Sequence, residues 1–349
     1  MSEQLIFTLD AANALHGIIP AVAPDAPKAI ITDTNVGRLL TPDIIQGLPV
    51  ITIEAGEEHK NVEMLTHVWR EMAAAGLTRK SATICIGGGV TTDLGGFAAA
   101  TFKRGIANVN VPTTLLAQVD ASVGGKTGID LDGLKNEIGA FARPRAVIVS
   151  PQWLRTLPRT EWLSGYGEML KHALLGGPEM VATLPDVDEL MAMEPAGLLQ
   201  TVEQSVEVKR RIVEADPTEQ GIRAALNLGH TAGHALESLL LQRGTPIPHG
   251  AAVAYGTVTA LVLSRMLRDM DGKWLYDTAH RVLRIYGPVP SACAMHPELL
   301  ELMHHDKKNT TGRAVRFSLL DAPGQPALGI EVPDDEIRAA LDITADLLS

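Results

Sequence analysis

The chain has 349 residues, with 30 Lys and Arg against 41 Asp and Glu, which gives a formal net charge of −11 at pH 7. Proteins that bind nucleic acid by neutralising phosphates usually carry a basic surplus, so this balance argues against that class. The length favours about two domains of roughly 150 residues each. A composition of 46% hydrophobic and 20% charged residues is typical of folded globular proteins, not of disordered chains.

Cysteine usage and apolar segments indicate the compartment. Cys85 and Cys293 lie far apart, so they form neither a disulfide framework nor a CxxC pair. Residues 1–10 lack the basic and apolar regions of a signal peptide. The longest apolar stretch, 251–263, is shorter than the roughly 20 residues of a membrane span. We therefore expect a cytoplasmic protein that does not enter a membrane.

The first half of the chain alternates short β-branched runs with helical patterns. Strands are predicted at 28–32, 49–53, 82–86, 108–111 and 146–149, and helices at 61–75 and 91–100. Strands that alternate with helices predict βαβ units and a mostly parallel sheet. Residues 1–30 carry no motif that we can interpret.

Helical patterns dominate from about residue 158. Helices are predicted at 160–175, 196–215, 222–241, 251–270, 273–285 and 334–347, and 314–320 is the only segment that reads as a strand. The fold class is therefore α/β + α, with a Rossmann-like α/β domain over 1–157 and a mainly helical domain over 158–349.

A triple glycine follows the strand predicted at 82–86, in the sequence ATICIGGGVTTDLGG. Glycines after a parallel strand let the backbone approach a phosphate closely, and the next helix adds its N–H groups and positive dipole end. This segment is a candidate nucleotide or phosphate site. It does not match GxGxxG, and a tight strand-to-helix turn is the alternative.

Residues 111–141 place many polar side chains among glycines. Lysines beside small residues suit an anionic substrate or cofactor, and a solvated, turn-rich loop is the alternative. A P-loop is excluded, because the glycine that this motif needs before Gly125-Lys126 is missing. The polar residues are Thr113, Thr114, Asp120, Lys126, Lys135 and Asn136.

Histidines and a carboxylate form a metal-like pattern. His230 and His234 are spaced i, i+4 on one helix face, His249 precedes a further helix, and Glu168 lies on an earlier one. Two or three histidines with a carboxylate match an open catalytic zinc site. A histidine pair satisfied within the core or at the surface is the alternative.

Six cations are scattered through this acidic chain, and Lys171 shares a helix face with Glu168. Each alone reads as a solvated surface charge. Together with a metal they describe a site for a phosphorylated or carboxylated small molecule. They are Arg104, Lys171, Lys209, Arg223, Lys307 and Lys308.

These motifs resemble the 3-dehydroquinate synthases, a family of the sugar phosphate cyclases. The resemblance runs in register over most of the chain and implies a carbon–oxygen lyase of the shikimate pathway that acts on phosphates. The matching segments are GEEHK (56–60), GGGVTTDLGGF (87–97), FKRG (102–105), VPTTLLAQVDASVGGKTG (111–128), LKNEIGAF (134–141), GYGEMLKH (165–172), GIRAALNLGHTAGHALE (221–237), HG (249–250) and HDKKN (305–309).

The resemblance implies NAD in the N-terminal domain and one zinc or cobalt ion held by Glu168, His230 and His249. His234 then faces the substrate, not the metal. The positions that match NAD contacts are Asp33, Glu57, Lys60, Gly88, Gly89, Asp93, Thr113, Thr114, Lys126, Lys135 and Thr156. The positions that match substrate contacts are Asp120, Lys126, Asn136, Lys171, Lys209, Arg223, Asn227, His234 and Lys307 or its neighbour Lys308, with Arg104 from the partner of a homodimer.

The implied substrate, 3-deoxy-arabino-heptulosonate 7-phosphate, carries a carboxylate and a phosphate, which explains site cations in an acidic chain. The implied reaction is a transient oxidation by NAD, elimination of phosphate, return of the hydride, ring opening and an intramolecular aldol step. Alternatives are a cyclase for an amino analogue or for sedoheptulose 7-phosphate, a metal-dependent alcohol dehydrogenase, and a non-catalytic nucleotide sensor. The chain departs from the family pattern at Leu134, Asp130 and Pro217, and Asp130 adds a negative charge near the predicted anion site.

Overall fold

A computed structural model describes residues 3–132, 134–294, 296–305 and 314–349. The chain divides into two compact units. The first unit comprises residues up to 158 together with 193–206, and the second comprises 159–192 and 207–349.

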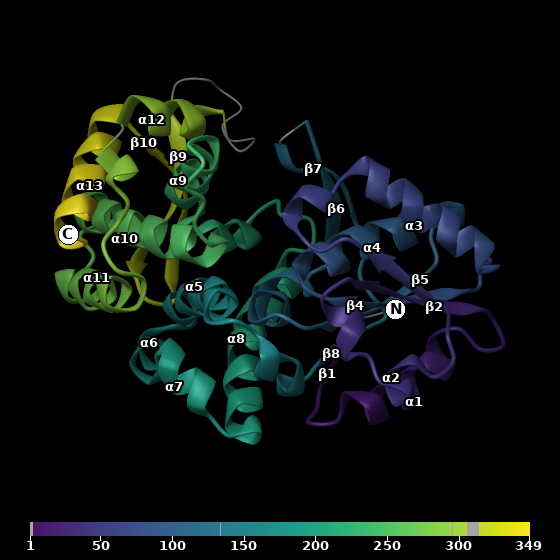
Figure 1. The fold of residues 1–349 in the computed structure, drawn as a ribbon. Coiled ribbons are helices and arrows are strands. Elements are labelled where there is room, and N and C mark those ends of the chain that lie inside the picture. The colour runs from purple at the N-terminus through teal and green to yellow at the C-terminus, as the bar shows by residue number, and fades with distance from the viewer. Residues whose placement is uncertain (1–2, 133, 295, 306–313) are drawn as a thin grey trace. The chain divides into compact units, whose positions relative to one another are not determined.

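A six-stranded parallel sheet forms the centre of the first unit (Figure 1). Its strand order is β1-β8-β5-β4-β2-β3, and every described pairing within it is parallel. The strands are β1 (Gln4–Phe7), β2 (Lys28–Asp33), β3 (Val50–Ile53), β4 (Ala82–Gly87), β5 (Ala107–Pro112) and β8 (Ala146–Val149).

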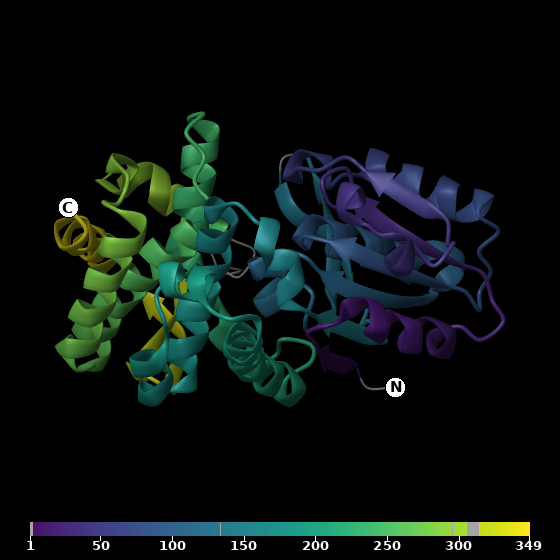
Figure 2. The same cartoon turned by 60° about the horizontal axis from the view of Figure 1, so that its bottom comes forward.

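Helices cover both faces of this sheet (Figure 2). On β2, Ile30 packs with the core that includes α1 and α2, whereas Ile31 packs with the core that includes α3 and α4. Burial on both faces explains why these strands are continuous apolar runs instead of alternating patterns. The helices are α1 (Ala11–Val22), α2 (Pro42–Ile45), α3 (Val62–Ala74) and α4 (Gly89–Thr101).

The strand order reverses between β2 and β4. From β2 the chain goes to β3 at one edge, and it then returns to place β4, β5 and β8 on the other side. In open α/β sheets, ligands bind outside the carboxyl ends of the strands at such a reversal. Asp33 ends β2, and Gly87 ends β4.

A two-stranded hairpin follows β5. Its strands, β6 (Lys126–Leu131) and β7 (Leu134–Phe141), are antiparallel, and a π-helical turn at Ala117–Ala121 precedes them. Gly128 and Gly139 face each other across it, and a Cβ on Gly139 would lie 2.3 Å from the carbonyl oxygen of Thr127. The pattern of glycines and polar residues had concealed these strands.

The second unit is mainly helical, so the predicted α/β + α class is confirmed. α8 (Pro195–Ala215) begins in the first unit and ends in the second. The other helices are α5 (Arg159–Gly176), α6 (Pro178–Thr183), α7 (Val187–Ala192), α9 (His230–Gln242), α10 (His249–Arg268), α11 (Gly272–Tyr286), α12 (His296–His304) and α13 (Asp334–Leu347).

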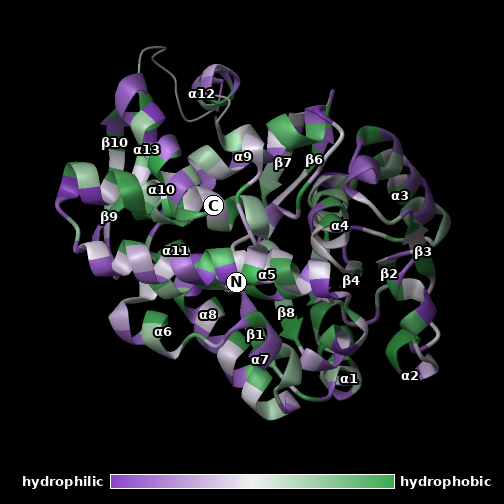
Figure 3. Ribbon diagram, turned by 60° about the vertical axis from the view of Figure 1, so that its left-hand side comes forward, coloured by the Kyte–Doolittle hydropathy of each residue, from purple (hydrophilic) through white to green (hydrophobic). Residues whose placement is uncertain are grey.

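α10 is the central helix of the second unit, and its hydrophobic residues lie in the interior (Figure 3). Its 20 residues are long and apolar enough to cross a membrane by length and composition, although the uninterrupted apolar stretch 251–263 is too short for a span. However, 83% of that apolar window is buried by the unit itself. Packing within the protein therefore accounts for its hydropathy.

Two predictions for the second half are wrong. The helix predicted at 222–241 is interrupted: a 3₁₀ helix, Ile222–Asn227, precedes α9, and Gly229 between them has a φ of 78°. The strand predicted at 314–320 is present as β9 (Val315–Ala322), but it is not the only one, because it pairs antiparallel with a second strand, β10 (Gln325–Val332). Pro326 and Gly329 had hidden the strand pattern of β10.

Candidate active site

Several predicted NAD residues of the first unit, among them Asp33, Gly88 and Thr113, lie at or just after the carboxyl ends of β2, β4 and β5. Asp33 Oδ1 accepts hydrogen bonds from the backbone N–H groups of Asn35 and Val36 at 2.9 and 3.0 Å. Its Oδ2 accepts one from Thr91 Oγ1 on α4 at 3.1 Å. The Thr113 N–H donates to Gly87 O at 2.9 Å. These bonds tie three strand ends to the first turn of α4.

Gly88 is the N-cap of α4 and brings no side chain to the first turn of that helix. A Cβ at Gly88 would lie 3.1 Å from Thr114 Cγ2, so the loop after β5 approaches closely. A helix N-terminus of this kind offers backbone N–H groups and a positive dipole end to an anion. α4 begins at Gly89, not at residue 91 as predicted, which places Asp93 beyond the first turn.

Lys60 is the centre of a buried polar network. Only 3% of the residue is exposed, and its Nζ donates to Asp93 Oδ2 at 2.7 Å and to Asn136 Oδ1 at 2.6 Å. Burial would lower the Lys60 pKa, but Asp93 and Glu57 outweigh it and raise that pKa above its ordinary value. The network joins predicted NAD residues to Asn136, a predicted substrate residue.

Asp130 supports the same network. Its Oδ1 accepts the backbone N–H of Asn136 at 2.7 Å, and its own N–H donates to Lys60 O at 2.7 Å. Asn136 has a φ of 52°, a backbone conformation that this bond helps to hold. Asp130, which departs from the family pattern, therefore stabilises the hairpin through its side chain.

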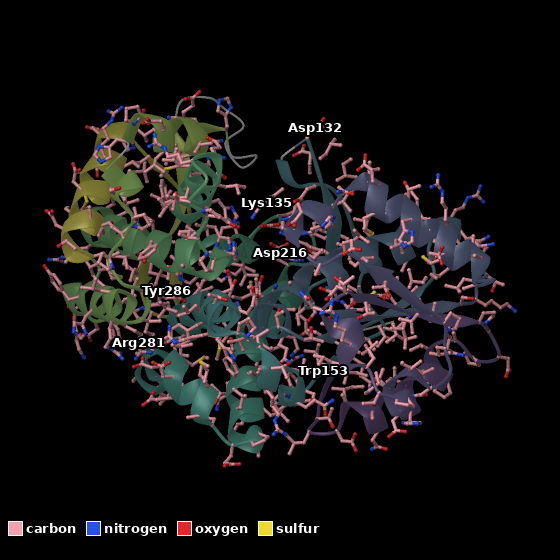
Figure 4. All side chains as sticks on the ribbon, viewed as in Figure 1. Asp132, Lys135, Trp153, Asp216, Arg281 and Tyr286 are labelled. Atoms are coloured by element: carbon pink, nitrogen blue, oxygen red, sulfur yellow. The ribbon has the colours of Figure 1, made fainter. Side chains whose placement is uncertain are left out.

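The remaining predicted residues of the first unit lie on loops and on the hairpin. Lys126 and Lys135 are exposed on β6 and β7, and Figure 4 labels Lys135. Asp120 lies in the π-helical turn, and Thr156 ends a short 3₁₀ helix. Arg104 lines an open hollow of about 460 Å³ with Thr78, Arg79 and Lys103.

In the second unit, three helices bring Glu168, His230 and His249 together. Glu168 lies in the middle of α5 and is 0% exposed. His230 is the first residue of α9 and His249 the first of α10. Each histidine Nε2 lies 3.4 Å from Glu168 Oε1. Glu168 Oε2 forms an ion pair with Lys171, one turn further along α5.

Hydrogen bonds orient both histidine rings. His230 Nδ1 lies 3.1 Å from Leu228 O, and His249 Nδ1 lies 3.1 Å from Glu237 Oε2. Carbonyl and carboxylate oxygens only accept, so each Nδ1–H donates and each Nε2 faces Glu168. Metal-binding histidines are commonly held in this way, with the second ring nitrogen on a carbonyl or carboxylate.

The charges around Glu168 favour its ionised form. Burial would raise its pKa, but the Lys171 charge, together with the contact from His230, holds the pKa well below its usual range. Burial and the Lys171 charge lower the His230 pKa, which keeps that imidazole neutral. For His249, burial also lowers the pKa, but Glu168 and Glu237 outweigh it and raise the pKa to about 10.

The donor set fits a divalent metal. A separation of 3.4 Å is long for a hydrogen bond. It matches the edge of about 3.3–3.4 Å that metal–ligand bonds of about 2.0–2.1 Å give in a tetrahedron. His234 also lies close: the candidate ligand atoms of His230, His234 and His249 all fall within 4.8 Å of one another.

The other predicted substrate residues of this unit are mostly buried cations. Lys171 and Lys209 are buried on α5 and α8, and Arg223 is 2% exposed in the 3₁₀ helix before α9. Asn227 ends that 3₁₀ helix and donates to Glu219 Oε1 at 3.2 Å. Lys307 and Lys308 lie outside the described residues.

Three residues with supporting roles were missed by the sequence analysis. Thr91 and Glu237 hold Asp33 and His249, and Asp130 holds Asn136. Glu237 could have been noticed in the sequence, because it follows His234 by three residues and so lies on the helix face that carries the histidines. The Thr91 contact joins two segments that are far apart in the sequence, and the Asp130 contact crosses the hairpin, which the sequence did not predict.

The fold is similar to those of two solved synthases. The first is 2-deoxy-scyllo-inosose synthase complexed with carbaglucose-6-phosphate, NAD⁺ and Co²⁺, at 24% identity and a TM-score of 0.84 over 97% of this chain and 95% of that one. The second is 2-epi-5-epi-valiolone synthase from Streptomyces hygroscopicus subsp. jinggangensis with NAD⁺ and Zn²⁺ bound. It is 24% identical, with a TM-score of 0.84 over 99% of this chain and 97% of that one.

The sequence also matches family models and a curated relative. Residues 50–164 match the model of the 3-dehydroquinate synthase N-terminal region, and residues 165–309 match that of the C-terminal region. The chain is 43% identical to 3-dehydroquinate synthase from Parabacteroides distasonis over 98% of both chains. These matches show that the chain belongs to the 3-dehydroquinate synthase family.

Proposed function

We propose that this protein converts 3-deoxy-arabino-heptulosonate 7-phosphate into 3-dehydroquinate and inorganic phosphate. One observation carries the proposal: a fully buried Glu168 faces the Nε2 atoms of His230 and His249 and pairs with Lys171. In a member of this family, a metal-type donor set beside a buried cation suits a substrate that carries hydroxyls and anionic groups.

NAD binds, in this proposal, at the strand-order reversal of the first unit. The Asp33–Thr91 bond, the Gly88 N-cap and the Lys60–Asp93 pair support this placement. The contacts are assigned to Asp33, Glu57, Lys60, Gly88, Gly89, Asp93, Thr113, Thr114, Lys126, Lys135 and Thr156. The domains are assigned as an NAD-binding domain over 1–157 and a metal- and substrate-binding domain over 158–349.

Glu168, His230 and His249 would hold one zinc or cobalt ion. When bound, the ion would lower the pKa of a substrate hydroxyl, and NAD would supply reversible hydride chemistry. The Nδ1–H bonds to Leu228 and Glu237 keep both Nε2 atoms directed at Glu168.

The cations bind the substrate's two anionic ends. Arg223 and Lys209 are buried, and a buried charge attracts an anion more strongly than a solvated one. Lys171 holds a positive charge beside Glu168, which favours anionic groups there. The substrate contacts are assigned to Asp120, Lys126, Asn136, Lys171, Lys209, Arg223, Asn227, His234 and Lys307.

The partner assignments follow from the resemblance. The protein acts as a homodimer in the cytoplasm, and Arg104 of one subunit reaches the substrate of the other. The exposed position of Arg104, beside Arg79 and Lys103, supports this role. Neither nucleic acid nor a membrane is a partner, in line with the acidic charge and the burial of α10.

The test is phosphate release from 3-deoxy-arabino-heptulosonate 7-phosphate, measured with NAD before and after metal is removed by a chelator. We expect release that needs both NAD and metal, with 3-dehydroquinate as product and no net NADH. If no phosphate appears after zinc or cobalt is restored, the proposal is wrong. Release from the amino analogue or from sedoheptulose 7-phosphate would then identify a related cyclase.

A further inference from the structure

A single carboxylate organises the turn between α8 and the 3₁₀ helix Ile222–Asn227. Asp216 follows the last residue of α8, and Figure 4 labels it. Its Oδ1 accepts the backbone N–H of Gln220 at 3.0 Å. Its Oδ2 accepts the N–H groups of Gly221 at 2.6 Å and Arg223 at 3.1 Å. Three backbone donors thus converge on one side chain.

The turn that Asp216 closes holds two side chains predicted to contact substrate. Arg223 Nη1 donates to Pro217 O at 2.7 Å. Asn227 Nδ2 donates to Glu219 Oε1 at 3.2 Å, and Glu219 has a φ of 60°, which is uncommon outside glycine. Both acceptors belong to the turn, so their positions depend on its closed form.

The chemistry of the turn requires a carboxylate. An ionised carboxylate is an acceptor at both oxygens, whereas an amide has one acceptor and one donor. The N–H of Gln220, with those of Arg223 and Gly221, holds the Asp216 pKa below its ordinary value, so the side chain stays ionised at neutral pH. Asparagine would turn an NH₂ group toward at least one of the backbone donors.

We propose that Asp216 is a positioning residue that sets the Arg223 guanidinium and the Asn227 amide for the anionic substrate. It does so through the backbone of residues 217–221 and touches no reacting atom. This inference rests on the proposed function, because Arg223 and Asn227 are substrate residues only within it. It adds a residue to the substrate site that carries no predicted contact of its own.

The test compares Asp216→Ala and Asp216→Asn with the control Glu214→Ala. Glu214 lies two residues earlier and forms an ion pair with the half-buried Arg210 through a 2.8 Å contact. We expect Asp216→Ala to raise KM for the heptulosonate phosphate about tenfold or more, because small displacements of binding groups are costly. KM for NAD should stay within about twofold of the parent value, because the proposed NAD contacts lie in the first unit and are not changed. For Asp216→Asn, KM for the heptulosonate phosphate should lie between the values of Asp216→Ala and the parent, because the amide keeps one acceptor oxygen.

A second readout does not depend on activity. Arg223 is 2% exposed, so phenylglyoxal should modify it slowly in the parent protein and in Glu214→Ala. Peptide mapping should show faster modification of Arg223 in Asp216→Ala, or in Asp216→Asn if the alanine variant does not fold. The inference would be overturned if the Asp216 variants had the same substrate KM as Glu214→Ala and the same slow modification of Arg223. If the parent releases no phosphate, the proposed function fails, and the modification rate still tests the role of Asp216.

Discussion

Gly167 and Gly250 touch where α5 crosses α10. A Cβ at Gly167 would lie 2.1 Å from the carbonyl oxygen of Gly250, so only hydrogen fits there. Glu168 follows Gly167 and His249 precedes Gly250. The two helices therefore approach closely beside two of the proposed metal ligands.

The same arrangement occurs between α9 and α10. A Cβ at Gly256 would lie 2.1 Å from the carbonyl oxygen of Gly229, and His230 follows Gly229. Helices joined by glycine contacts can approach more closely than larger residues allow. Glycines next to the ligands thus set the distances within the donor set.

Replacing Gly250 with alanine tests this arrangement. The new Cβ would lie 2.0 Å from Ser164 O, a backbone atom that cannot turn away. We expect the free energy of unfolding to fall by about 3 kcal/mol or more in urea titrations. Gly197→Ala in α8 is the control, since a Cβ there meets nothing within 4 Å. An equal, small effect of both substitutions would refute the packing argument.

His230→Ala should remove most bound metal and lower turnover by about a thousandfold or more, because Lewis-acid assistance contributes several kcal/mol. Metal content by mass spectrometry and phosphate release measure the two effects. His280→Ala, an exposed histidine of the same unit, should change neither. Metal-dependent turnover retained by His230→Ala would exclude this residue as a ligand.

Glu237→Gln should weaken metal binding while leaving all three proposed ligands in place. Its carboxylate lies 3.1 Å from His249 Nδ1 and holds that ring by a charged hydrogen bond. Loss of such a partner typically costs about 10–100-fold in metal affinity. Competition with a chelator measures the change, with exposed Glu301→Gln as the control. An unchanged affinity would show that packing alone orients His249.

Metal affinity should increase with pH. In the metal-free protein, Glu168 and Glu237 overcome burial and raise the His249 pKa to about 10, so the ring is protonated at neutral pH. Binding must displace that proton, so affinity should rise by up to about tenfold per pH unit below the raised pKa. Calorimetry in two buffers of different ionisation enthalpy counts the protons released. Affinity that stays constant between about pH 7 and 9 would contradict this proton displacement.

Lys60→Met should destabilise the first unit. It removes the 2.7 Å bond to Asp93 and the 2.6 Å bond to Asn136. The partly buried Asp93 carboxylate loses this ion pair, so the free energy of unfolding should fall by about 2 kcal/mol or more. The double variant Lys60→Met with Asp93→Asn should recover part of that loss. Exposed Lys80→Met should have little effect, and equal effects of both single variants would refute the assignment.

The sequence predicts the central strands well because burial on both faces of the sheet leaves a recognisable pattern in each short segment. β2 and β4 are apolar runs between polar turns, and a strand buried on both faces requires that pattern. The hairpin β6–β7 was missed because its glycines and charges resemble a loop. The predicted helix at 222–241 failed at Gly229, whose Cβ would lie 2.3 Å from Thr257 Oγ1 on a distant segment.

The geometry of the candidate site, like the break at Gly229, depends on contacts between segments that are far apart in the sequence. Spacing alone groups His230 with His234, whereas the resemblance pairs His230 with His249 and Glu168. In the structure, Nε2 atoms of His230 and His249 both face Glu168 Oε1. Only tertiary packing creates that geometry, because no local pattern joins α5, α9 and α10.

The three proposed ligands come from helices that begin at residues 159, 230 and 249. No short fragment of the chain contains the full set, so high-affinity metal binding requires α5, α9 and α10 to be assembled together. A chain trapped with any of these helices misplaced would lose the ion. The amount of tightly held metal in a preparation therefore counts correctly folded molecules, independently of any assay of turnover.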